Sequence, residues 1–99
     1  MEAYYYETIE VAVPSTHGAL VIYGKPYCRG WSVELHSAAG DSNLRNEPKQ
    51  HAAFIERQGA SGPVVAAVFP RVKPGNWFAS GGGCDYVTVY AGEVAELDW

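Results

Sequence analysis

Short blocks of apolar residues, bounded by glycine or proline, run along the whole chain and indicate β-strands rather than helices. The clearest alternation covers residues 31–36, where Trp31, Val33 and Leu35 are apolar and the residues between them are polar. This pattern is typical of a strand with one face buried. Residues 64–69 form a nearly continuous apolar block, which predicts a central strand.

The remaining strands follow from the same reasoning. They are predicted over residues 8–13, 19–23, 50–57, 76–80 and 85–90, with a last short extended piece over 94–99. Turn residues separate them, including the Gly59–Gly62 hairpin, a long loop over 37–48 that we expect to be mobile or functional, and a flexible tip at Gly81–Gly83. Seven or eight short strands predict an all-β, Greek-key, immunoglobulin-like sandwich without substantial helix. A partly open barrel is the alternative.

A chain of 99 residues has room for one hydrophobic core, so we predict a single domain over 1–99, with residues 1–6 as a candidate N-terminal arm. The net charge of −4 and the scattered basic residues indicate that nucleic acid is not the partner. No apolar run is long enough to span a membrane, so we expect no membrane partner either. The first residues lack the pattern of a secretion signal, so we expect a cytoplasmic protein.

Two stretches resemble the carboxypeptidase-regulatory-like and transthyretin-like (prealbumin-like) group of sandwich domains. Residues 69–77, F-P-R-V-K-P-G-N-W, are similar to the F-x-x-L-x-P-G-x-Y turn of that group. Residues 87–98, V-T-V-Y-A-G-E-V-A-E-L-D, resemble its closing strand, and residues 18–35 give a weaker third match. The resemblance implies a β-sandwich whose members are usually non-enzymatic folding aids, adhesion units or carriers.

The turn in the first stretch also has a physical explanation that is independent of the family. Pro74 presets a φ near −65°, and Gly75 can take the positive φ that a type II turn requires next. Trp77 then begins a strand with a large ring that can cap the core.

In an immunoglobulin-like topology, alternate loops gather at opposite ends of the sandwich. One end would hold Lys25, Tyr27 and Arg29 with two glycine-rich tips, which makes it a candidate ligand or partner site. The alternative is a set of tolerant loop tips. Cys28 and Cys84 fall at the same end, where they could form a disulfide; the alternative is two reduced thiols in a cytoplasmic protein.

The other end would hold His17, His36 and His51, with Asp41 and Glu47 in the neighbouring loop. Imidazoles with a carboxylate suit zinc or another borderline metal. No two of these histidines have the close spacing of a metal motif, so surface histidines that titrate near neutral pH are the alternative.

Motifs for catalysis and for cofactor binding are absent from the sequence. There is no nucleophile elbow, phosphate-binding loop or dinucleotide fingerprint, so we expect a protein without a cofactor and without enzymatic activity. Glu34 and Glu56 could be neighbours across the sandwich, although surface acids on strands are usually only solvated.

Seven tyrosines are too many for a core of this size, so some must be exposed. Tyr4, Tyr5 and Tyr6 could add an edge strand to a neighbouring molecule. We therefore predict a small binding or interaction module, with a protein partner or a second copy held through an aromatic sheet face or edge. The alternative is a small-ligand or metal-binding protein that uses one loop end.

Overall fold

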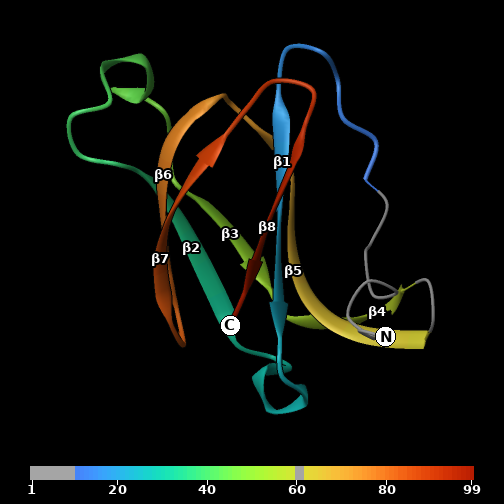
Figure 1. Ribbon diagram of the computed structural model, residues 1–99. Helices are drawn as coiled ribbons and strands as arrows, with labels where there is room; N and C mark the ends of the chain where they lie inside the picture. Colours follow the sequence, from blue (N-terminus) through green and yellow to red (C-terminus); the bar gives the residue numbers. More distant parts are fainter. Residues whose placement is uncertain (1–10, 60–61) are drawn as a thin grey trace.

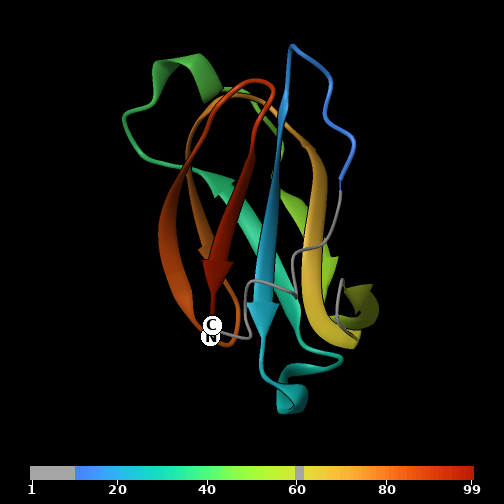
Figure 2. The same cartoon turned by 45° about the vertical axis from the view of Figure 1, so that its right-hand side comes forward.

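Two four-stranded β-sheets pack face to face in the computed structural model, which describes residues 11–59 and 62–99 (Figure 1). The strands are β1 (Gly18–Gly24), β2 (Ser32–Ser37), β3 (Gln50–Ala53), β4 (Ile55–Gly59), β5 (Gly62–Val72), β6 (Gly75–Ser80), β7 (Cys84–Val89) and β8 (Val94–Asp98). One sheet has the order β4-β5-β1-β8 and the other β3-β2-β6-β7. In the turned view, β1 of one sheet crosses in front of β2 of the other (Figure 2).

The predicted all-β sandwich without substantial helix is confirmed, and the described residues form eight strands. Two single 3₁₀ turns, η2 (Pro26–Cys28) and η3 (Ser42–Leu44), are the only helical segments in residues 11–59 and 62–99. Within these ranges, no helix has the length and apolar character needed to cross a membrane.

The prediction of a strand over residues 8–13 is wrong for residues 11–13, the part of it that the structure describes. Residues 11–13 belong to neither sheet, and residues 8–10 lie outside the described part of the chain. The carbonyl of Pro14 accepts a hydrogen bond from the N–H of His17, which turns the chain just before β1. Alternation along a segment indicates which side chains share a face, but it does not supply a partner strand.

β1 lies at the centre of its sheet and is buried on both faces. Residues 18–22 are all buried, and the strand pairs with β5 in antiparallel fashion and with β8 in parallel fashion. Leu20 and Ile22 face the other sheet and form part of the core. A strand that is covered on both faces needs apolar residues at consecutive positions, which explains the sequence GALVI over residues 18–22.

Trp77 is the largest fully buried side chain among the described residues, as its predicted capping role requires. Its Nε1–H donates to the carbonyl of Lys73 at 2.9 Å, so the one polar atom of the ring is satisfied. Gly75 has a φ of +148°, which is positive as predicted but wider than the value near +80° of a type II turn. A Cβ at this position would lie 2.8 Å from Leu44 Cδ1.

The loop predicted over residues 37–48 as mobile or functional covers residues 38–49 in the structure, where it is held against the β5–β6 connection. Leu44 is fully buried beside Gly75. The carboxylate of Asp41 accepts a hydrogen bond from the backbone N–H of Asn76 at 2.8 Å. The loop therefore covers one end of the core.

The strand predicted over residues 50–57 divides at Phe54 into β3 and β4, which belong to different sheets. The N–H of Phe54 donates to the carbonyl of Trp31 at 2.9 Å, and its carbonyl accepts from the N–H of Gly30 at 2.8 Å. The Phe54 ring is fully buried, with its centroid 5.8 Å from that of Trp99. These contacts fix the position where the chain crosses between the sheets.

Two of the three glycines between β6 and β7, Gly81 and Gly82, lie so close to their neighbours that a Cβ would force a shift. A Cβ at Gly81 would lie 2.5 Å from the carbonyl oxygen of Ser32, and a Cβ at Gly82 would lie 2.1 Å from the Trp31 ring. The prediction that Trp31 shares the buried face of Val33 and Leu35 is wrong. Trp31 precedes β2, is 40% exposed and lies against the glycine tip.

Replacing each of two tryptophans by phenylalanine should have unequal effects. Trp77→Phe removes a buried hydrogen bond and leaves a void, so we expect the free energy of unfolding to fall by about 1–3 kcal/mol. Trp99 Nε1 is buried without a hydrogen-bond partner, so Trp99→Phe should change it by less than about 1 kcal/mol. Urea unfolding of both variants measures this difference. Equal losses would contradict the conclusion that the Trp77 hydrogen bond stabilises the core and that Trp99 makes no such bond.

Alanine at the glycine tip should also discriminate between two neighbouring positions. Gly81→Ala meets a backbone oxygen, whereas Gly82→Ala meets a partly exposed side chain that can move. We expect a loss of about 1–3 kcal/mol for Gly81→Ala and a smaller loss for Gly82→Ala, measured by thermal or urea unfolding. A larger loss for Gly82→Ala would show that Trp31 is held rigidly in place.

Candidate functional site

One surface of the β3-β2-β6-β7 sheet is turned away from the other sheet and is here called the outer face. It carries a group of charged side chains around Glu34. The alternation predicted for β2 positions it: Val33 and Leu35 are buried, whereas Glu34 and His36 are only half-buried. Register then places His51 of β3 directly opposite Glu34.

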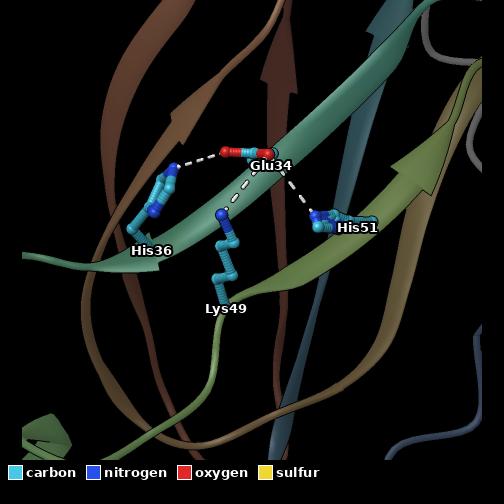
Figure 3. Close-up of polar contacts among 4 residues, drawn as sticks. All are labelled: Glu34, His36, Lys49 and His51. Atoms are coloured by element: carbon cyan, nitrogen blue, oxygen red, sulfur yellow. Dashed lines mark hydrogen bonds and ion pairs between the residues drawn. The ribbon is translucent and has the colours of Figure 1, made fainter.

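Glu34 lies at the centre of a charged group that also contains His36, Lys49 and His51, here called the Glu34 cluster (Figure 3). His36 Nε2 is 3.0 Å from Glu34 Oε1, and His51 Nε2 is 3.4 Å from Oε2. Lys49 Nζ is 3.7 Å from the same Oε2. The two imidazoles thus approach different oxygens of one carboxylate, and Figure 3 shows them on opposite sides of it.

The cluster is accessible to water, because its side chains are between 37% and 54% exposed. Ion pairs of this exposure contribute little to stability. The arrangement does, however, present imidazole N–H groups and an ammonium group at a surface where a partner could meet them.

The predicted three-histidine group does not form. His36 and His51 share Glu34, but His17 lies in the turn before β1, with its Nδ1 3.0 Å from Thr16 Oγ1. Across residues 11–59 and 62–99, no group of three or more histidine, cysteine, aspartate or glutamate side chains is arranged to hold a metal ion. Residues at one end of a sandwich can still lie far apart across its width, which strand order alone does not reveal.

An aromatic row lies next to the Glu34 cluster on the outer face. His36 is paired with Phe78 of β6, and Phe78 is paired with Tyr86 of β7. The Phe78 and Tyr86 ring centroids are 4.9 Å apart, and Tyr86 is 72% exposed. Sequence reasoning missed this row, although alternate positions on either side of the Gly81–Gly83 tip could have suggested the Phe78–Tyr86 pair.

A cleft of about 570 Å³ opens where β1 ends, and it contains two of the predicted ligand residues, Lys25 and Arg29. The cleft is lined by Tyr23, Gly24, Lys25, Pro26, Arg29, Glu56, Pro63, Val64, Val65 and Asp98. The structure therefore brings the loop after β1 together with the β4–β5 hairpin, whereas the Gly81–Gly83 tip, also predicted at this end, does not line the cleft. Arg29 Nη1 is 3.0 Å from Glu56 Oε1 at the cleft wall.

Tyr27, the third predicted residue of this end, does not line the cleft. It is 70% exposed, and its ring centroid lies 5.7 Å from that of Trp31. Tyr4, Tyr5 and Tyr6, predicted as an edge-adding arm, lie outside the described residues.

The two cysteines are free thiols, so the structure contains no disulfide between Cys28 and Cys84. Cys28 is buried in η2, whereas Cys84 is exposed at the start of β7. Glu34 and Glu56 do not form a carboxylate pair either, because they lie on different sheets and have different ionic partners.

Comparison of the chain with protein-family models, with curated proteins and with solved structures finds no match. The resemblance to carboxypeptidase-regulatory-like and transthyretin-like domains therefore stays a prediction. The function proposed below is inferred from the surface residues of the structure.

Substitutions at Glu34 test whether the carboxylate neutralises its neighbours. Glu34→Gln should lower the free energy of unfolding by less than about 1 kcal/mol, because the ion pairs are exposed. Glu34→Lys should lower it further, since a lysine would face His36, Lys49 and His51. Urea unfolding of both variants measures the two losses. Equal losses for Glu34→Gln and Glu34→Lys would contradict this account of the cluster.

Proposed function

We propose that this protein is a non-enzymatic interaction module that self-associates through β7, the edge strand that carries the exposed end of the aromatic row. The single observation that supports this most strongly is that nothing in the described part of the chain protects the free edge of β7. An edge strand presents unpaired backbone groups, and proteins normally protect such edges with charges, proline, bulges or very short strands.

The other three edges carry such protection. β3 has only four residues. β4 contains the adjacent charges Glu56 and Arg57, and β8 contains Glu96 and Asp98. β7 has six residues, pairs with β6 without a register shift, contains no proline or glycine, and has Asp85 as its sole charge.

Pairing of two β7 strands would be symmetric. In an antiparallel pair related by a two-fold axis perpendicular to the sheet, outer-face residues of one copy lie opposite outer-face residues of the other. Tyr86 of each copy would then lie on the same side of a continuous sheet, and the two aromatic rows would join. The interface between two six-residue edges is small, so the dimer should be weak and dependent on concentration.

Lysine on the exposed edge is the direct test. The wild-type protein should show a molar mass in sedimentation or light scattering that rises with concentration from monomer toward dimer. Thr88→Lys, at an exposed position of β7, should keep the protein monomeric over the same range. Ile55→Lys, at an exposed position of the β4 edge, is the matched control and should dimerise like the wild type.

Circular dichroism and thermal melting should establish that both variants remain folded. A wild-type protein that stays monomeric at the highest concentration would overturn the proposal. If Ile55→Lys lost association as strongly as Thr88→Lys, the interface would not be specific to β7, and the proposal would be overturned as well.

A further inference from the structure

The cleft at the end of β1 is a second surface, separate from the β7 edge, and its walls come from three directions. The loop containing η2 supplies Lys25 and Arg29, and the β4–β5 hairpin supplies Glu56 and the apolar residues that begin β5. The end of β8 supplies Asp98. A volume of about 570 Å³ lies within the range of about 300–1,000 Å³ that is usual for small-ligand sites.

The cleft contains two cationic and two anionic side chains, and these groups make few hydrogen bonds within the protein. Lys25 and Arg29 are cations, whereas Glu56 and Asp98 are anions. Arg29 donates one of its five N–H groups to Glu56, and Lys25 Nζ donates to the backbone oxygen of Trp99 at 3.3 Å. The backbone of Asp98 pairs with β1, but its side-chain carboxylate has no hydrogen bond or ion pair with the described residues. Donors and a carboxylate are therefore both available, which favours a ligand that carries charges of both signs.

The apolar wall of the cleft is formed by the first residues of β5, whose backbone is extended. β1 pairs with β5 as far as Gly24 opposite Val65, and there the chain turns away into η2. β5 continues through Val64 and Pro63, which pair with β4 on one side and have no strand partner among the described residues on the other. A short extended segment could lie there in the row that β1 leaves, with apolar side chains against Pro63 and Val65.

We propose that this cleft binds a short apolar peptide with free termini, whose carboxylate lies at Lys25 and Arg29 and whose ammonium group lies at Asp98. Charge complementarity is the reason for this ligand class: an anion alone would approach Glu56 and Asp98, and a cation alone would approach Lys25 and Arg29. The inference does not depend on self-association through β7, because the two surfaces share no residue.

The test uses ¹⁵N-labelled protein and the tripeptide alanyl-valyl-alanine with both termini free. Saturable shifts of the amide signals of Gly24, Val64, Val65 and Asp98 are expected. The same peptide with an acetylated N-terminus and an amidated C-terminus should bind about tenfold more weakly, since two exposed ion pairs are lost.

Two variants and one control complete the experiment. Arg29→Gln and Asp98→Asn should each weaken binding about threefold, the effect expected for a partly exposed ion pair. Arg71→Gln, which removes a charge from an exposed position outside the cleft, should leave binding unchanged. Thermal melting shows whether the variants remain folded.

Three results would overturn the inference: no shifts at the cleft up to the solubility limit of the peptide, equal binding of the blocked peptide, or equal weakening by Arg71→Gln. None of them bears on dimerisation through β7, which the sedimentation experiment with Thr88→Lys decides separately.

Discussion

Two backbone hydrogen bonds of Phe54 hold the point where the chain leaves one sheet and enters the other, and much of the architecture depends on them. Buried backbone polar groups must find partners, and those of Phe54 find Gly30 and Trp31 just before β2. The same contacts fix the loop after β1 against the start of β4. One wall of the cleft and the packing site of the Trp99 ring therefore both follow from this junction.

The two candidate surfaces are linked through β2 and the loop before it. Arg29, in that loop, lines the cleft, while the middle of β2 carries Glu34 and His36 on the outer face. The outer face combines an ion-paired carboxylate with the half-buried Phe78 ring and the exposed Tyr86 ring, a mixture of polar and aromatic groups that protein interfaces commonly use. Strand alternation positions the side chains of the outer face, whereas the loop around η2 positions the two basic side chains of the cleft.

The sequence predicted the strands that have a strong local signal. The alternation in β2 and the apolar blocks in β1 and β5 were sufficient, because a pattern of period two directly reports burial. It did not predict the change of sheet at Phe54, since periodicity does not specify which neighbour a strand will pair with. For the same reason the grouping of histidines was wrong: His36 and His51 meet through cross-strand register with Glu34, which depends on the order of strands in space.

The parallel pairing of β1 with β8 has a consequence for how the protein folds. It joins a strand near one end of the described chain to the last strand at the other end, so the loop between them spans almost the entire domain. Contacts of this kind require a large loss of chain entropy before they give any stabilisation. Folding should accordingly be slow for a domain of this size, and until β8 arrives β1 has an open edge that other chains can occupy.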